Sequence, residues 1–371
     1  MRKLILSLIA SLLISSIHAQ MDIPPSGNNP RATISEEVGI TSITLKYSRP
    51  DVNKREGKVY GDGNLVPYGF STTNFITGKN TSPWRAGANE ATTISFEHDV
   101  KVEGKDIVAG TYAIFMAMGP DDITLIFSKQ VDAWGSFYYK EEDDVLRVKV
   151  KPVLLDKSVE WLKYEFIEHK EKSCVIAMQW EKVSVPFKVE VDVDNIVLAR
   201  LRQQVTSQKG FNSNNMLQAA QWCLNKNINL EEALQWSIRA IIGFQGQKSF
   251  ITLRNLANAY DKLSRTVQAD STMDEALTIA TANQYTAYGR QLITQKRVDR
   301  AMDIFRASEK RYGDMYGVNN GLMSGYSAKG DFKYAIKHAE KAMAQAPGEA
   351  AKKQIEEYIK KLKDGKDINQ P

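Results

Sequence analysis

Residues 183–193 read Val-Ser-Val-Pro-Phe-Lys-Val-Glu-Val-Asp-Val, and the pattern of the chain changes just after them. Apolar and polar side chains alternate strictly in this stretch, which is typical of a β-strand with one face on a core and the other in water. Pro186 has no amide hydrogen to donate. We therefore expect this strand to lie at a sheet edge or to carry a bulge.

The chain before this stretch has the same two-residue period. Alternation recurs over residues 43–47, 146–151 and 162–166, and residues 103–105, 109–111 and 119–122 carry turn-forming Gly, Pro and Asp. Many short strands separated by turns are typical of an antiparallel sandwich or jelly roll. Residues 48–90 are rich in Gly, Pro, Asn and Tyr, so we expect long loops with short strands there.

The chain after this stretch has a helical period. From about Asn214, apolar residues recur every three or four positions, as at Leu234, Ile238 and Ile241. The sequence therefore predicts two domains of overall α+β class. The first is an antiparallel β-sandwich or jelly-roll-like domain over residues 25–195, and the second is an all-α domain over residues 214–365. Residues 196–213 are predicted to link them, partly as a helix.

The helical half also repeats. Ala301 and Ala335 open similar segments 34 residues apart, and Pro347 follows the second of them. Small residues at this period allow two helices of a hairpin to approach closely, and the pattern resembles the tetratricopeptide repeat. We expect about four units between residues 214 and 345, with a capping helix over 349–362. The alternative is a helical bundle without repeats.

The N-terminus predicts export. Arg2 and Lys3 precede an apolar run over residues 4–17, and Ala19 offers a small residue for cleavage, so residues 1–19 read as a signal peptide. An uncleaved anchor is the alternative, but the run is shorter than the ~20 residues needed to span a bilayer. After cleavage we expect no transmembrane segment. The sequence thus predicts a periplasmic, extracellular or surface-associated protein.

Charge and cysteine content exclude some classes of protein. The formal net charge is +5, and +3 without Arg2 and Lys3, which is too small to indicate nucleic-acid binding. Cys174 lies in a strand-like run and Cys223 in a helix-like run. We expect both to be buried as small apolar residues. A disulfide between them is a weaker alternative, because they fall in different predicted domains.

Seven motifs occur in order in the first half, over residues 25–29, 47–52, 57–61, 65–69, 83–90, 109–112 and 134–139. Together they resemble one family of exported proteins, domain of unknown function 2911. The resemblance covers roughly residues 25–170. It implies an exported β domain, often followed by helical repeats, and brings no activity with it.

The sequence offers no catalytic constellation. The mature chain has three histidines, His98, His169 and His338, and none is spaced with another or with a cysteine as metal ligands are. A nucleophile elbow and a Gly-rich phosphate loop are also missing from the sequence. We therefore expect no metal, no cofactor and no catalytic residue, and more weakly that the protein is not an enzyme.

The polar and aromatic loops of the first half form a candidate ligand site. They hold Arg49, Asp51, Tyr68, Trp84, Arg85, Asn89, Glu90 and Trp134. One interpretation is a cleft in which aromatic faces stack a small molecule or glycan while Arg85 and Glu90 orient it. The other interpretation is structural, with Arg85 paired to Glu90 or Asp51. A hydrolase using Glu90 and Asp51 as its two carboxylates is the enzymatic alternative.

The helical half offers a candidate partner groove. Arg254 and Asn258 lie four residues apart on one predicted helix, and Arg290 and Asn320 fall on the equivalent helices two units on. The tetratricopeptide resemblance implies that such positions hold a peptide carboxylate, although the full clamp pattern is missing. The sequence thus predicts a binding or scaffold protein whose repeats take a protein or peptide segment.

Overall fold

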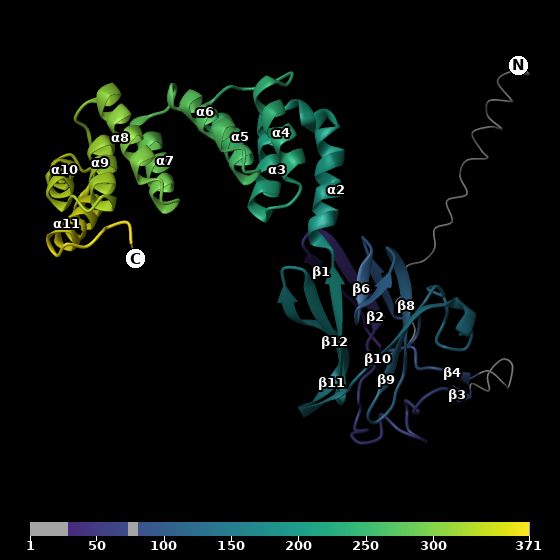
Figure 1. Ribbon diagram of the computed structural model, residues 1–371. Helices are drawn as coiled ribbons and strands as arrows, with labels where there is room; N and C mark the ends of the chain where they lie inside the picture. The colour runs from purple at the N-terminus through teal and green to yellow at the C-terminus, as the bar shows by residue number, and fades with distance from the viewer. Residues whose placement is uncertain (1–28, 73–80, 371) are drawn as a thin grey trace, which may run out of the picture. The chain divides into compact units, whose positions relative to one another are not determined.

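The computed structural model describes residues 29–72 and 81–370 (Figure 1). The chain divides into two compact units, Met1–Val197 and Leu198–Pro371. Strands dominate the described part of the first unit and helices that of the second. The predicted α+β class is therefore confirmed. The predicted signal peptide lies outside the described residues.

The first unit is built from antiparallel strands. In chain order they are β1 (Arg31–Val38), β2 (Thr41–Ser48), β3 (Ser71–Thr72), β4 (Thr81–Ser82), β5 (Thr93–Phe96), β6 (Val100–Val102), β7 (Lys105–Ile107), β8 (Gly110–Ala117), β9 (Ile123–Ser128), β10 (Asp144–Val150), β11 (Val153–Lys170) and β12 (Ser173–Val191). A six-stranded sheet has the order β1-β2-β5-β8-β9-β10, and a four-stranded sheet has the order β11-β12-β6-β7. Strands β3 and β4 pair only with each other in the described residues.

The two larger sheets enclose one apolar core. Ile94 and Phe127 contribute to it from the six-stranded sheet, and Met178 and Phe187 from the four-stranded sheet. Strand β2 shows why the alternation predicts this arrangement. Ile43 and Leu45 are fully buried, whereas Lys46, which follows Leu45, is exposed. Burial of the inward-facing set is what favours the sandwich.

Of the two expectations for Pro186, the edge position was wrong, whereas irregular pairing does occur in β12, whose register with β11 shifts before Ser184. Strand β12 lies inside its sheet, between β11 and β6. Its pairing with β11 ends at Ser184, and its pairing with β6 begins at Val189. Pro186 thus falls in the stretch where the strand passes from one partner to the other, so the missing amide hydrogen interrupts neither ladder.

The second unit is helical. Its helices are α2 (Val193–Val205), which crosses the division between the units, α3 (Ser213–Lys226), α4 (Leu230–Ile242), α5 (Phe250–Lys262), α6 (Thr266–Leu277), α7 (Ala282–Thr294), α8 (Val298–Tyr312), α9 (Tyr316–Ala328), α10 (Phe332–Ala344) and α11 (Glu349–Lys363). A short 3-10 helix covers Gln208–Phe211 in this unit, and another covers Glu141–Asp143 in the first unit. From α3 onward, consecutive helices pair as the hairpins α3/α4, α5/α6, α7/α8 and α9/α10, followed by α11.

Small residues mark the close contacts between these helices, as the repeat pattern predicts. Ala301 in α8 and Ala335 in α10 are fully buried. Gly289 in α7 lies so close to Phe305 in α8 that a β-carbon at position 289 would come within 2.1 Å of the ring. The second unit therefore packs as helical hairpins at the predicted period.

The described helices give no membrane span, because none of them combines the length and the apolar character that crossing a bilayer requires. Cys174 and Cys223 are both buried and both free. Burial raises the pKa of the Cys174 thiol to about 12 and that of the Cys223 thiol to about 11.

Candidate functional site

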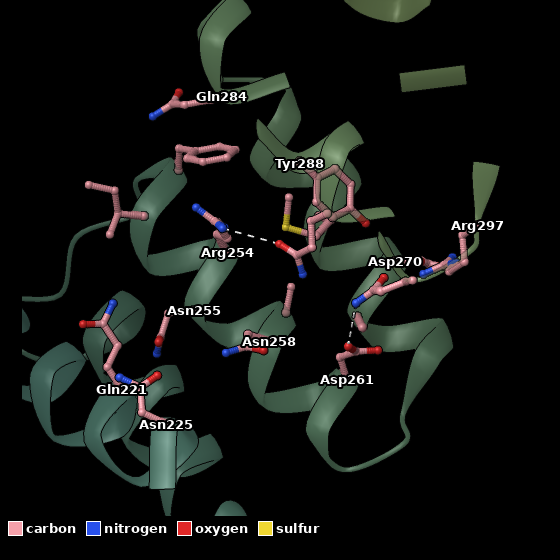
Figure 2. A pocket seen from close by; sticks show the side chains of 17 residues that line it. Gln221, Asn225, Arg254, Asn255, Asn258, Asp261, Asp270, Gln284, Tyr288 and Arg297 are labelled. Carbon is pink, nitrogen blue, oxygen red and sulfur yellow. Dashed lines mark hydrogen bonds and ion pairs between the residues drawn. The ribbon is translucent and has the colours of Figure 1, made fainter. Parts of the chain in front are cut away.

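The helical unit contains a cavity of about 510 Å³, which we call the helical cavity (Figure 2). Side chains from α3, α5, α6 and α7 and from the turn before α8 surround it. They are Gln221, Asn225, Phe250, Ile251, Arg254, Asn255, Ala257, Asn258, Asp261, Ala269, Asp270, Met273, Gln284, Tyr288, Gln291, Gln295 and Arg297. Polar side chains, mostly amides, outnumber apolar ones in this lining.

Helical periodicity explains why these residues meet. Helix α5 contributes Arg254, Asn258 and Asp261, which recur every three or four positions and therefore share one face. Helix α7 and its C-cap contribute Gln284, Tyr288, Gln291 and Gln295 with the same spacing. The cavity forms because the first helix of each hairpin presents such a polar stripe toward its neighbour.

Arg254 is an accessible cation in the helical cavity. Its Nη2 donates to Gln291 Oε1 at 3.4 Å, which is long for such a hydrogen bond. Its side chain is exposed, and no carboxylate pairs with it among the described residues. Arg297, by contrast, pairs with Asp270 at 2.6 Å. Arg254 is thus free to meet an acceptor or an anion that enters the cavity.

The amides of the cavity differ in how far the protein uses them. Asn255 Nδ2 donates to Ser237 Oγ at 2.9 Å, so this buried amide holds α5 to α4. Gln295 Nε2 reaches Asp261 Oδ2 only at 3.4 Å. Asn258 is half-buried, and Figure 2 shows it within the cavity lining. An amide offers both a donor and an acceptor, which is what a peptide group also offers.

Arg290 and Asn320, the other two predicted groove residues, contact each other. Arg290 Nη2 donates to Asn320 Oδ1 at 2.7 Å, and its Nε donates to Ser324 Oγ at 3.1 Å. These bonds join α7 to α9. Neither residue lines the helical cavity, and Arg290 has fewer donors left for a ligand than Arg254 has.

In the β-rich unit, three predicted ligand residues hold the structure together. Arg49 Nε donates to the carbonyl oxygen of Leu162 at 2.9 Å. Asp51 pairs with Arg55, at 3.3 Å between Oδ1 and Nη2. Trp84 stacks on Trp180 with ring centroids 5.9 Å apart, against the core.

Three others meet at one place. Glu90 and Trp134 lie opposite each other in an isolated antiparallel bridge, and the Gly135 amide donates to the Asn89 carbonyl oxygen at 3.0 Å. Asn89 Oδ1 also accepts from Asn29 Nδ2 at 3.2 Å. The two polar and aromatic loops predicted from the sequence are therefore neighbours here. Tyr68 is exposed on a different loop.

The structural interpretation of Arg85 was wrong. Glu90 forms an ion pair with Arg31, and Asp51 with Arg55. Arg85 pairs with neither carboxylate in the described part of the chain. Its Nε is buried without a hydrogen-bond partner, and burial lowers the pKa of its guanidinium.

Metal-ligating side chains do not gather in the described residues, where no group of three or more His, Cys, Asp or Glu could hold an ion. His98 contacts Thr41 and His338 contacts Asn319, while His169 pairs with Glu36. Each histidine thus has a separate structural partner.

Sequence reasoning missed most of the helical cavity. Gln221, Asn225, Tyr288 and Gln291 line it, whereas Arg254 and Asn258 are the two predicted groove residues that do so. Their spacing of three or four on successive first helices was a signal that could have identified them.

A comparison with protein families gives a match within the first unit. Residues 29–189 match the family described as "Protein of unknown function (DUF2911)". The β-rich unit matches the DUF2911 family. This confirms the resemblance that the motifs between residues 25 and 170 indicate. The curated proteins gave no match to the chain.

Three solved structures are similar to the helical part. The APC/C hetero-tetramer Cut9-Hcn1 has 16% identity and a TM-score of 0.31, over 45% of this chain and 34% of that one. MamA of AMB-1 has 14% identity and a TM-score of 0.26, over 41% of this chain and 85% of that one. YrrB, titled a TPR protein with an unusual peptide-binding site, has 14% identity and a TM-score of 0.29, over 46% of this chain and 92% of that one. This chain thus spans about a third of the first structure, and the repeat assignment rests on the hairpins themselves.

Proposed function

We propose that the protein is an exported scaffold whose helical cavity binds an extended polypeptide segment. The observation that carries the proposal is the amide-rich lining of that cavity, in which Arg254 has, within the described part of the chain, one hydrogen bond of 3.4 Å to Gln291. Stacks of helical hairpins commonly use such surfaces to bind protein segments.

The lining favours a polypeptide over a small apolar ligand. An extended chain carries one donor and one acceptor per residue, and both must be satisfied when it leaves water. Asn225, Asn258 and Gln291 offer donors and acceptors at intervals along the cavity. Arg254 adds a positive charge, so a segment with an acidic side chain or a free carboxyl end should bind best.

The proposal for the β-rich unit is less specific. Its loops would hold a small ligand or a partner, while the repeats recruit a polypeptide. Asp51 and Glu90 are held by different arginines, so the proposal does not include hydrolysis by this pair.

Export is part of the proposal and comes from the sequence of residues 1–19. The test is to express the full chain in its native cell, fractionate it and sequence the mature N-terminus. We expect a periplasmic or surface-associated protein that begins at Gln20. A cytoplasmic protein that retains Met1 or Arg2 would contradict the proposed export.

The binding test uses the full chain with an affinity tag in native envelope extract. Captured polypeptides are identified, and their candidate segments are synthesised and titrated against the purified protein. We expect a segment that binds at least about tenfold more weakly to an Arg254→Ala, Asn258→Ala double variant, which corresponds to about 1.4 kcal/mol.

The matched control is Arg306→Ala. Arg306 is exposed on α8 and does not line the helical cavity. This variant should bind the segment as the wild type does. Equal binding by the double variant and the wild type would remove the cavity from the proposal.

A further inference from the structure

The strongest unexplained feature of the β-rich unit is the side chain of Arg85. Its Nε is buried and has no hydrogen-bond partner in the described part of the chain, and no carboxylate there pairs with it. A guanidinium stays protonated in proteins, so it cannot escape burial by losing its proton. Burying a charge without a partner costs free energy, and binding of an anion would offset this cost.

The loop that carries Arg85 is held in a strained conformation. Ala86 and Asn89 both adopt left-handed backbone angles, with φ of 54° and 58°. The Ala86 carbonyl oxygen accepts from Tyr164 Oη at 2.8 Å and from Thr92 Oγ1 at 3.1 Å, and these bonds fix the loop. Non-glycine residues in this region cost free energy and tend to occur at functional sites.

Glu90 supplies an acceptor close by. Its Oε1 pairs with Arg31, whereas its Oε2 is buried and has no hydrogen-bond partner among the described residues. Because Glu90 and Trp134 lie opposite each other in an antiparallel bridge, their side chains leave the backbone on the same side. Trp134 is 52% exposed, so its ring offers a flat apolar face to the solvent.

Gly135 connects this pair with Arg85. A β-carbon at Gly135 would lie 3.8 Å from Arg85 Nη1, so the guanidinium runs against the backbone of the loop that carries Trp134. Arg85, Glu90 and Trp134 therefore belong to one neighbourhood, which we call the Arg85 cluster. It combines an unpaired cation, an unpaired acceptor oxygen and an exposed aromatic ring.

We propose that the Arg85 cluster binds the carboxylate of a small ligand that also carries a hydrogen-bond donor. The Arg85 guanidinium forms an ion pair with the carboxylate of the ligand, and Glu90 Oε2 accepts a hydrogen bond from the ligand's donor group. Two kinds of molecule present this chemistry, an acidic sugar with hydroxyl donors and an amino acid with its ammonium group. This inference specifies the ligand class for the proposed binding role of the β-rich unit and rests on that role.

The test titrates the full mature chain with glucuronate, alanine and glucose, followed by calorimetry and tryptophan fluorescence. We expect glucuronate or alanine to bind, and glucose, which has no carboxylate, to bind at least about tenfold more weakly. Binding of glucuronate alone assigns an acidic sugar, and binding of alanine alone assigns an amino acid. Arg85→Met should lower the affinity of the bound probe at least about tenfold.

The melting temperature of the ligand-free protein separates binding from architecture. Arg85→Met removes a half-buried charge that has no ion-pair partner among the described residues, and should leave the melting temperature unchanged or raise it. Arg55→Met is the matched control, because Arg55 donates to the Val52 carbonyl oxygen at 2.8 Å and to that of Asp51 at 2.9 Å. This control should melt at a lower temperature and bind the probe normally.

Two results would overturn the inference. The first is that neither glucuronate nor alanine binds, and the second is that the probe binds Arg85→Met as tightly as it binds the wild type. The Arg254→Ala, Asn258→Ala variant of the helical cavity is titrated in parallel and should bind the probe unchanged. Failure of the probe with intact binding of the polypeptide segment would therefore reject the Arg85 cluster and leave the helical cavity in place.

Discussion

Arg254 Nη2 lies 3.4 Å from Gln291 Oε1, so a long hydrogen bond joins α5 to α7 along the helical cavity. A bond of this length adds little to stability. The geometry leaves the guanidinium available to a ligand, while Leu253 of α5 and Tyr285 of α7 contribute to one buried apolar cluster. Stability and binding should therefore separate cleanly at this residue.

Arg254→Ala is expected to change the free energy of unfolding by less than about 0.5 kcal/mol, as is usual for an exposed side chain with one weak contact. Arg290→Ala should cost about 1–3 kcal/mol, because it breaks bonds to Asn320 and Ser324. Urea unfolding of both variants, followed by circular dichroism of the helices, measures the difference. Equal losses would mean that Arg254 also holds the fold.

Gly289→Ala should destabilise the helical unit by about 1–3 kcal/mol, because the new β-carbon would meet the Phe305 ring at 2.1 Å and the core must shift. Gly348 is the control. A β-carbon there meets nothing within 4 Å, so Gly348→Ala should cost at most about 1 kcal/mol, which is the cost of alanine at the N-cap of α11. Thermal unfolding compares the two variants, and a neutral Gly289→Ala would contradict the packing of α7 on α8.

His338 predicts a pH dependence of the last hairpin. Its Nδ1 donates to Asn319 Oδ1 at 2.9 Å, and burial lowers the pKa of the imidazole below 6.5. The folded protein thus binds this proton less readily than the unfolded chain does. The resulting stability is present above the unfolded pKa and is lost as the pH falls below it.

The measurement is the free energy of unfolding at pH 7.5 and at pH 5, for the wild type and for His338→Gln. Glutamine keeps a hydrogen-bonding group but does not titrate. The wild type should lose more stability between these two pH values than the variant. Parallel losses would show that other groups cause the acid sensitivity.

Both cysteines should be slow to react. Burial raises the pKa of the Cys174 thiol to about 12 and that of Cys223 to about 11, so almost no thiolate is present at pH 8. A thiol reagent should label neither residue in the folded protein and both in denaturant. Stability from these protonated thiols should be lost as the pH rises from about 9 toward 11–12. Rapid labelling of the folded chain would contradict their burial.

Much of the fold follows from local patterns in the sequence. The alternation around Ile43 and Leu45 and the 34-residue spacing of Ala301 and Ala335 are local signals of burial on one face, and these side chains are buried. Pro186 shows the limit of such reasoning. Its tolerance depends on where β12 leaves one partner for the next, and only the sheet order reveals that.

The sites were less predictable, because pairing between distant residues decides them. Arg31 pairs with Glu90 and Arg55 pairs with Asp51, so Arg85 has no ion-pair partner within residues 29–72 and 81–370. No local pattern in the sequence predicts which arginine pairs with which carboxylate. Arg290 and Asn320 look equivalent to Arg254 and Asn258 by spacing. They contact each other instead of the cavity, since α7 and α9 pack closely there.

The most direct test of polypeptide binding by the helical cavity is photo-crosslinking in the native cell. A photoreactive amino acid replaces Asn258, which lines the cavity, or Asp303, which is exposed on α8 outside that lining. We predict a crosslinked polypeptide from position 258 that is weakened by Arg254→Ala and is missing from position 303. Crosslinks of equal yield from both positions, or from position 303 alone, would contradict the account.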